Sequence, residues 1–319
     1  MMDYFANIIG QNKIINTLKT SLATGKVSHA YLFCGPAGVG KMQVAMAFAR
    51  SIIAQEDNQA ELYFNQGFHP DLFIIERLEN RNLIAKEQIS REMGSWISLK
   101  PYRAKHRIVL IRDAHLMSID AANTLLKPLE DPPAYAIIIL VSDAENIIET
   151  IVSRCQVLRF IPVPQKQLEE HLIMRGFDNE KAVYAARLGQ GSVACAISFA
   201  EEEGLQETWE IALGLIKSLV LGQKGAIFDA ADIINHSPEL IVKILQTILR
   251  DALIFDNNQG ELLLPLELQD ILGELKDKDK NKIMAAIMEI DRLKQYYRYN
   301  VNSKLLNTLI GYQLWEALH

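Results

Sequence analysis

The sequence has little cysteine. Cys34, Cys155 and Cys195 are its only three, and none of them forms a CxxC motif. An odd number of dispersed thiols does not fit a disulfide framework, and the spacing does not fit a thiolate metal site. We therefore expect three reduced, packed cysteines and no bound metal.

Long apolar runs are also missing. The longest, such as residues 136–141, are far shorter than the ~20 residues that span a bilayer. The first residues, MMDYFANIIGQ, lack the basic flank and apolar core of a signal peptide. These absences predict a cytoplasmic protein that does not associate with membranes.

The chain has no excess of positive charge, since 39 acidic residues outnumber 33 lysines and arginines and give a net charge of -6. A uniformly basic surface for nucleic acid is thereby excluded, and any DNA contact must be local. Hydrophobic residues make up 49% of the sequence, which excludes a mostly disordered chain. A length of 319 residues predicts two or three domains.

The first 160 residues alternate short β-rich apolar runs with segments of helical periodicity, which predicts an α/β fold with a parallel sheet covered on both faces. The expected helices include residues 11–24 and 118–130. The expected strands are residues 31–34, 72–76, 107–112 and 136–141.

The character of the chain changes after the Ile-Pro-Val-Pro segment at 161–164, because no β-rich run follows it. We expect a core domain at 1–163, a small helical domain at 164–206 and an all-α domain at 207–319. Within the last domain we expect helices at 240–255, 283–293 and 304–318, and a solvated helix start or loop in the charged run at 276–282.

The segment GPAGVGK at 35–41 lies between an expected strand and an expected helix, as a phosphate-binding loop does. Backbone N–H groups at Gly35, Gly38 and Gly40 would surround an anion, and Lys41 would reach the terminal phosphates. The next residue is Met42, whose thioether cannot replace the hydroxyl oxygen that Mg²⁺ requires. Two interpretations stay open: weak nucleotide binding, or a loop kept for its fold alone.

The second element of a phosphate site is an apolar strand that ends in an acidic pair. The apolar residues 108–111 are followed here by Arg112 and Asp113. In one register, Arg112 replaces the acid that organises the metal; in the other, Ala114 replaces the acid that activates water. Both registers leave the hydrolytic pair incomplete, so we do not expect ATP hydrolysis at this site.

Several motifs occur together along the chain. They are IGQ at 9–11, SHAYLF at 28–33, GFHPD at 67–71, ANTLLKPLEDPP at 122–133, IVSRCQ at 151–156 and NVNSKL at 300–305. With these motifs the sequence resembles the AAA+ clamp-loader ATPases, and among them the delta-prime subunits of bacterial DNA polymerase III. The resemblance implies a RecA-like parallel-sheet domain, a small helical lid domain and an all-α C-terminal oligomerisation collar.

The resemblance gives a role to the motif Ser153-Arg154-Cys155. In this family the arginine projects into the nucleotide site of the neighbouring subunit and acts there as an arginine finger. A guanidinium is always charged and forks onto phosphate oxygens, which suits it to this task. The alternative for Arg154 is a helix-capping or surface-paired arginine.

The sequence also departs from the family's motor subunits. Met42 replaces a serine or threonine, Arg112 replaces an aspartate, and Ala194 occupies the place of a sensor arginine. Many relatives bind zinc through four cysteines, whereas residues 54–71 contain none. His69 alone cannot form a tetrahedral site, and we assign it no chemistry.

The resemblance and the departures together predict a non-hydrolysing subunit of a heteropentameric clamp loader. Its expected partners are gamma/tau-like motor subunits and a delta-like subunit, together with the sliding clamp and primer-template DNA through the assembled complex. No cofactor is required, and binding of ATP or ADP is weak or absent. The alternatives are a motor subunit that hydrolyses ATP itself and, in third place, a P-loop small-molecule kinase.

One local cluster of basic residues precedes the third expected strand. It consists of Arg103, Lys105, His106 and Arg107. Two interpretations stay open for it: a local contact with DNA, or a solvated loop.

Overall fold

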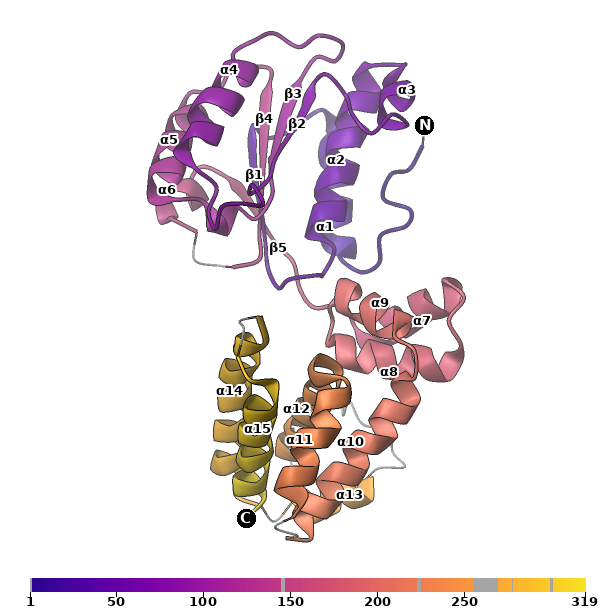
Figure 1. Cartoon of the computed structure of the whole chain (residues 1–319). Helices are drawn as coiled ribbons and strands as arrows, with labels where there is room; N and C mark the ends of the chain where they lie inside the picture. The colour runs from indigo at the N-terminus through magenta and orange to yellow at the C-terminus, as the bar shows by residue number, and fades with distance from the viewer. Residues whose placement is uncertain (1, 145–146, 223–224, 255–268, 277, 299–300) are drawn as a thin grey trace. The chain divides into compact units, whose positions relative to one another are not determined.

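The computed structural model describes residues 2–144, 147–222, 225–254, 269–276, 278–298 and 301–319 (Figure 1). The chain packs into two compact units. The first comprises residues 1–168 and 191–194, and the second comprises residues 169–190 and 195–319. The limits inferred from the sequence at 163 and 206 divide the chain more finely and stay predictions.

The first unit is built on a five-stranded sheet in which every pair of neighbours is parallel. Its order is β2-β3-β4-β1-β5. The strands are β1 (Ala30–Cys34), β2 (Leu72–Ile75), β3 (Arg107–Ile111), β4 (Ala136–Ser142) and β5 (Gln156–Arg159). The first four confirm the four predicted strands to within one residue at either end.

Both faces of the sheet are covered, so its central strands are buried along their whole length. In β1, Tyr31 and Phe33 face one apolar cluster, while Leu32 faces the other. Side chains of a strand point alternately to opposite faces, and a strand buried on both faces therefore reads as a continuous apolar run. This is the pattern from which the strands were predicted.

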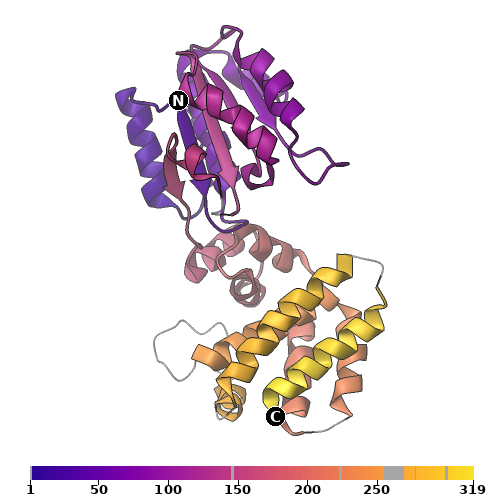
Figure 2. The same ribbon diagram turned by 90° about the vertical axis from the view of Figure 1, so that its left-hand side faces the viewer.

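Helices form the two outer layers of the first unit (Figures 1 and 2). One layer contains α1 (Asn12–Thr24), α2 (Lys41–Glu56) and α3 (Ala60–Phe64), and the other contains α4 (Gly94–Ile97), α5 (Ile119–Glu130) and α6 (Glu149–Val152). A π-helical turn, η1 (Gln88–Met93), precedes α4, and a 3-10 turn, η2 (Ala114–Leu116), precedes α5. Both predicted helices of this unit are confirmed as α1 and α5.

The edge strand β5 was not predicted. It has four residues, of which only Leu158 is buried, and it begins and ends with the polar Gln156 and Arg159. An edge strand this short lacks the apolar run that revealed the central strands.

The second unit is helical, and past Arg159 the described part of the chain contains no strand. Two helices, α7 (Gln165–Met174) and α9 (Val193–Glu201), have their first residues in the first unit and their remaining residues in the second. The other elements are α8 (Asn179–Gly189), α10 (Leu205–Val220), α11 (Ala226–His236), α12 (Pro238–Ile254), α13 (Gln269–Leu275), α14 (Lys280–Lys294), the 3-10 turn η5 (Gln295–Arg298) and α15 (Ser303–Leu318). The predicted change from alternating strands and helices to helices alone is confirmed, and with it the α/β fold class.

The three helices predicted near the C-terminus are confirmed as α12, α14 and α15, although residue 255 lies outside the described residues. The charged run at 276–282 was predicted to be a helix start or a loop, and it contains both: residues 276, 278 and 279 are not helical, and Lys280 begins α14. Residue 277 lies outside the described residues. Asp279 caps α14, because its Oδ1 accepts a hydrogen bond from the backbone N–H of Asn281 at 2.8 Å.

Close packing joins α15 to α11 within the second unit. Gly311 makes this approach possible, since a Cβ atom there would lie 2.9 Å from the Cβ of Ala230. On its other side α15 packs beside α14, as Figure 2 shows. These contacts make α15 a central element of the helical unit.

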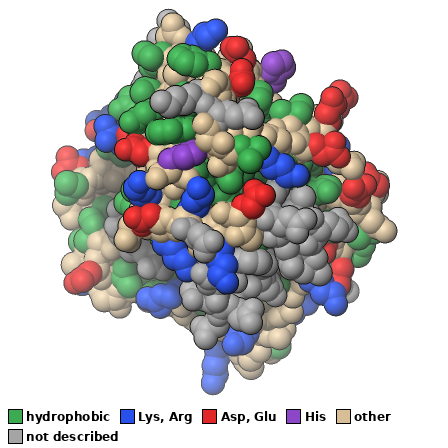
Figure 3. Space-filling view, turned by 90° about the horizontal axis from the view of Figure 1, so that it is seen from below, with side chains coloured by type: hydrophobic (Ala, Val, Ile, Leu, Met, Phe, Trp, Pro, Cys, Tyr) green, Lys and Arg blue, Asp and Glu red, His purple; other side chains and the backbone are tan. Residues whose placement is uncertain are grey.

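The surface of the second unit seen in Figure 3 carries basic and acidic side chains interspersed with apolar groups. This mixture agrees with the balance of charge in the sequence. Across the described segments, no helix combines the length and the apolar character needed to cross a membrane.

Candidate functional site

The loop at residues 35–40 connects β1 to α2 at the carboxyl edge of the sheet. β1 lies between β4 and β5, and β5 is the last strand along the chain. The order of strands thus changes direction at β1, and in α/β sheets such a point forms the usual ligand crevice. The strand-loop-helix context expected of a phosphate-binding loop is present.

The three glycines of the loop have positive φ angles, 142° at Gly35, 73° at Gly38 and 96° at Gly40. Side chains are also excluded by neighbouring atoms. A Cβ at Gly35 would lie 2.4 Å from the carbonyl oxygen of Phe160, and a Cβ at Gly38 would lie 2.1 Å from Oγ of Ser192. Glycine is therefore required for the shape of this loop and for its packing.

Lys41 is the first residue of α2, directly after the loop, and is only 3% exposed. Its Nζ donates hydrogen bonds to the carbonyl oxygens of Gly35, at 2.7 Å, and Pro36, and it forms an ion pair with Oδ1 of Asp143 at 2.8 Å. An ammonium group has three N–H donors, and here three acceptors surround it. A phosphate would have to displace at least one of them.

Met42 occupies the first turn of α2 and is partly buried against the apolar cluster on that face of the sheet. Together with Tyr4, Ile8 and Met46 it lines a hollow of about 380 Å³ between α2 and the N-terminal segment. The thioether thus contributes to packing, and it supplies no hard oxygen ligand for Mg²⁺.

Arg112 and Asp113 follow β3, as the sequence indicated. Nη1 of Arg112 lies 3.1 Å from Oε1 of Glu76, and its Nε lies 3.8 Å from Oδ2 of Asp113. The guanidinium is thus flanked by two carboxylates at the end of the strand. Asp113 itself has a left-handed backbone, with φ of 51°, where η2 begins.

Residues 191–194 belong to the first unit and pack against the loop. The backbone N–H of Ala194 donates to the carbonyl oxygen of Gly38 at 3.2 Å, and Ser192 is buried against the same glycine. The expected sensor position therefore does lie beside the phosphate loop. Its side chain is a methyl group, which cannot bind phosphate.

Arg154 lies in a turn after α6, away from the phosphate loop. Its Nη1 donates to the carbonyl oxygen of Thr150 at 2.8 Å and to Oγ of Ser153 at 3.2 Å, and its Nη2 pairs with Oε1 of Glu130. The side chain stays 33% exposed. Cys155 is turned inward, and burial raises the pKa of its thiol to about 12.

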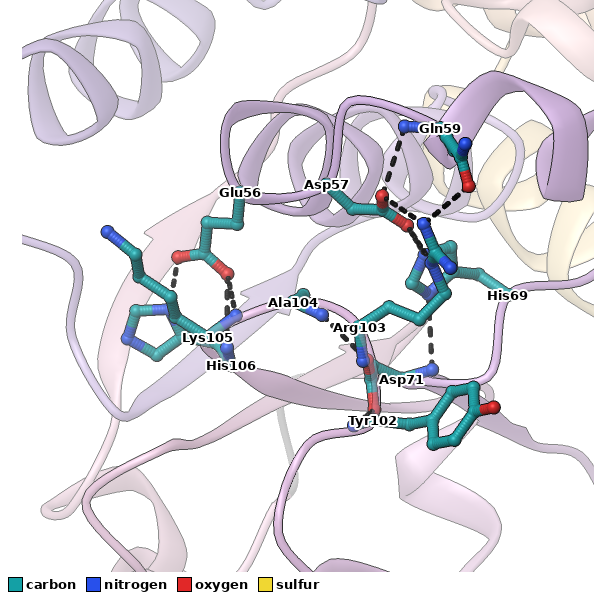
Figure 4. Close-up of polar contacts among 10 residues, drawn as sticks. All are labelled: Glu56, Asp57, Gln59, His69, Asp71, Tyr102, Arg103, Ala104, Lys105 and His106. Carbon is teal, nitrogen blue, oxygen red and sulfur yellow. Dashed lines mark hydrogen bonds and ion pairs between the residues drawn. The ribbon is translucent and has the colours of Figure 1, made fainter.

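Two members of the basic cluster before β3 contact carboxylates within the first unit, Arg103 at Asp57 and His106 at Glu56 (Figure 4). Nε and Nη2 of Arg103 bind Oδ2 and Oδ1 of Asp57 at 2.8 and 3.0 Å, and the guanidinium of Arg107 stacks 4.3 Å from the ring centroid of Trp96. Lys105 is exposed. The two arginines thus have structural contacts, which neither of the two open interpretations anticipated.

Residues 54–71, where the family resemblance placed the zinc-binding cysteines of relatives, contribute carboxylates to a polar network (Figure 4). His69 is buried, with its Nε2 3.3 Å from Oδ2 of Asp57 and its Nδ1 accepting from the backbone N–H of Asp71. Among the described residues, no three His, Cys, Asp or Glu side chains are grouped to bind a metal ion. The absence of zinc stays a prediction.

Two neighbours of the loop were missed by sequence reasoning, Asp143 and Ser192. Asp143 directly follows β4, which pairs with β1. Because the carboxyl ends of parallel strands meet at one edge, an acid directly after β4 could have been assigned to this site. For Ser192, which reaches the loop from a distant part of the chain, we find no such signal.

Comparison with known proteins gives matches to subunits of DNA polymerase III. The family model described as "DNA polymerase III, delta subunit" matches residues 10–164. The delta' subunit of Bacillus subtilis DNA polymerase III is 26% identical over 309 residues, which cover 92% of each protein. The tau/gamma subunit of Haemophilus influenzae is 27% identical over 330 residues, which cover 94% of this chain and 46% of that protein.

Among solved structures, a gamma-subunit-related protein of DNA polymerase III from Thermotoga maritima superposes with a TM-score of 0.51. The match has 18% identity and covers 95% of this chain and 99% of that one. At this identity it is evidence for the fold alone. The chain spans less than half of the longer tau/gamma relative but nearly all of the Bacillus delta' subunit.

Proposed function

Because the chain belongs to the clamp-loader family of DNA polymerase III subunits, we propose that it is a delta-prime-like subunit that does not hydrolyse ATP itself. In this proposal it assembles with gamma/tau-like motor subunits and a delta-like subunit in the cytoplasm. The assembled ring loads the sliding clamp onto primer-template DNA. This chain supplies an arginine finger and requires no cofactor of its own.

The observation that carries the proposal is the chemistry of the two side chains at the magnesium-supporting positions. Met42 packs against an apolar cluster, and Arg112 places a cation at the end of β3. Mg²⁺ requires oxygen ligands, and hydrolysis requires a water held near an acid. Neither side chain supplies an oxygen, so both supports of hydrolysis are missing in the register that places Arg112 at the metal-organising position. In the other register Ala114 replaces the acid that activates water, and the pair is again incomplete.

The surroundings of Lys41 favour weak or absent binding of ATP or ADP. Its ammonium is enclosed by two loop carbonyls and by Asp143. A nucleotide would gain the contact with Lys41 only by breaking some of these bonds, so part of the binding energy would be lost.

The proposed contribution to hydrolysis is Arg154, acting on a neighbouring subunit. Its guanidinium is partly exposed at the surface, whereas Lys41 is enclosed. Arginine fingers stabilise charge on the transferring phosphoryl group and act in trans in other nucleotide-hydrolysing systems.

The alternative function is that of a motor subunit that hydrolyses ATP itself. It is favoured by the similarity to the tau/gamma subunit over 94% of the chain and by the intact glycines and lysine of the loop. It requires a magnesium ligand other than the residue at 42.

Steady-state release of phosphate by the purified chain, with Mg²⁺ and ATP, separates the two functions. We expect no turnover above the background of the Lys41→Ala variant. A turnover near ~1 s⁻¹, typical of slow enzymes, that disappears in Lys41→Ala would establish the motor function instead.

A further inference from the structure

The turn that carries Arg154 is anchored on both sides. Before it, α6 is a single helical turn in which Ile151 is buried. After it, Cys155 packs against the same apolar cluster that covers one face of the sheet. The backbone of Arg154 is therefore fixed, and only its long side chain has freedom of position.

That freedom is restricted by contacts with two different elements. Nη1 binds Thr150 and Ser153 of its own turn, whereas Nη2 pairs with Glu130, 24 residues earlier in the chain. Three of the five guanidinium N–H donors thus have partners among the described residues. Two remain for the oxygens of a phosphate.

Glu130 is itself on a rigid support. It is the last residue of α5, whose Ala122, Leu125 and Leu129 are buried against the sheet, and two prolines follow at 132 and 133. Its carboxylate thus occupies a defined place at the end of the helix. The Leu-Glu-Asp-Pro-Pro segment at 129–133 and the Ser-Arg-Cys motif at 153–155 are thus in direct contact.

We infer that Glu130 is a positioning residue for Arg154: its carboxylate selects the side-chain conformation in which the free guanidinium donors point outward to the neighbouring subunit. The inference rests on the proposed function. An arginine side chain has many rotamers, and it loses this conformational entropy when it engages a ligand. A conformation selected beforehand reduces that loss.

The strength of the pair suits this role. Glu130 is 52% exposed and Arg154 33% exposed, and ion pairs this exposed contribute little to stability. The contact biases the side chain without holding it against an incoming phosphate, which carries more charge than a carboxylate. Loss of the contact should therefore slow the neighbour's reaction moderately.

The test is single-turnover ATP hydrolysis in the reconstituted complex, with the phosphate loops of the other motor sites disabled. Glu130→Ala should lower the maximal rate about three- to fivefold, which is what an exposed pair supports, and should leave the apparent affinity for ATP unchanged. Glu130→Gln keeps an acceptor oxygen and should retain most of the rate. Asp131→Ala, which changes the adjacent exposed acid, is the matched control and should have no effect.

A double variant separates positioning from general damage. In the Arg154→Ala background, Glu130→Ala should change nothing further, because Glu130 acts only through Arg154. The inference is overturned if Glu130→Ala leaves the rate unchanged while Arg154→Ala lowers it, or if the two effects add. If Arg154→Ala itself has no effect, the proposed finger role fails together with the inference.

Discussion

Single carboxylates determine the course of the loop before β3. Both oxygens of Asp71, which is fully buried, accept backbone N–H groups of residues 102–104 at 2.7–2.9 Å. Glu56 accepts those of residues 105 and 106 (Figure 4). A carboxylate that accepts several backbone N–H groups fixes the path of the chain around it. The loop is therefore held by hydrogen bonds from its backbone to two carboxylates.

The stability of this network should depend on pH. The Arg103 guanidinium holds the pKa of Asp57 well below its usual range. Burial alone would raise the pKa of Glu56, but hydrogen bonds from His106 and from the backbone lower it overall. A carboxylate whose pKa is lowered by folding stabilises the protein fully when the pH is above its unfolded-state pKa, near ~4. This contribution is lost as the pH falls below that value and through the folded-state pKa.

We predict that Asp57→Asn lowers the urea midpoint of unfolding at pH 7, because it removes the charged partner of Arg103. The difference in urea midpoint between the variant and the wild type should narrow as the pH falls below about 4. Below this pH the carboxylate of the unfolded wild-type chain becomes protonated before that of the folded chain, which favours unfolding. Glu87→Gln, at an exposed position, is the control and should show no such trend. A difference for Asp57→Asn that stays constant from pH 7 to pH 3 would contradict the assignment.

At the residue scale, the sequence was informative where chemistry follows from residue type. Met42 and Arg112 were identified as departures from the motifs around them, and Ala194 was identified through the family resemblance. Each occupies the place expected along the fold. The ion pairs of Lys41 with Asp143 and of Arg154 with Glu130 were not identified. They join segments far apart in the sequence, and only the packed sheet and helices bring them together.

Among the elements, the contact of α15 with α11 depends on a missing side chain. Gly311 is buried in the middle of α15. A Cβ atom added there would lie 2.9 Å from the Cβ of Ala230 and 3.0 Å from the carbonyl oxygen of Ile227. Gly214 is a useful contrast, since it lies inside α10 and is exposed. A Cβ atom added at Gly214 would have no other atom within 4 Å.

We predict opposite effects for two identical substitutions. Gly214→Ala should stabilise the protein by roughly 0.5–1 kcal/mol, because alanine favours a helix interior over glycine. Gly311→Ala should destabilise it by about 1–3 kcal/mol, because the added methyl forces α11 and α15 apart. Thermal unfolding of both variants is the measurement. Equal shifts in the same direction would show that the two helices are not packed as described.

Elements were predictable where burial leaves a periodic pattern. The strands β1 to β4 and the helices α12, α14 and α15 follow from continuous or periodic apolar residues. The strand β5 was missed, because its pairing with β1 comes from the fold and not from its own composition. The π-helical turn η1 was missed for the same kind of reason, since no residue pattern distinguishes it from an α-helix.

On the scale of the whole molecule, the helical unit presents apolar side chains to solvent on α14 and α15, which pack beside each other. The exposed residues are Met284, Met288, Leu305, Leu309 and Tyr312. Exposed apolar groups collected on neighbouring elements are typical of protein interfaces. In the proposed function this surface is the oligomerisation collar.

We predict that Met288→Glu combined with Leu305→Glu lowers the affinity of the chain for its partner subunits at least tenfold, which corresponds to about 1.4 kcal/mol. The circular dichroism and unfolding midpoint of the isolated chain should stay unchanged, since both side chains are exposed. Leu62→Glu, at an exposed position on α3, is the control. Undiminished assembly of the double variant would exclude this surface as the collar interface.

The central claim is that this chain serves ATP hydrolysis in a neighbouring subunit and not in its own phosphate loop. The most direct test is single-turnover hydrolysis at the one competent neighbouring site of a reconstituted complex that contains Arg154→Ala. Comparable arginine fingers contribute roughly 10³ to 10⁵ in rate, so we predict a fall of at least ~10³ with assembly intact. Arg154→Lys should restore little, because it lacks the planar fork. Hydrolysis at the wild-type rate in the Arg154→Ala complex would contradict the account.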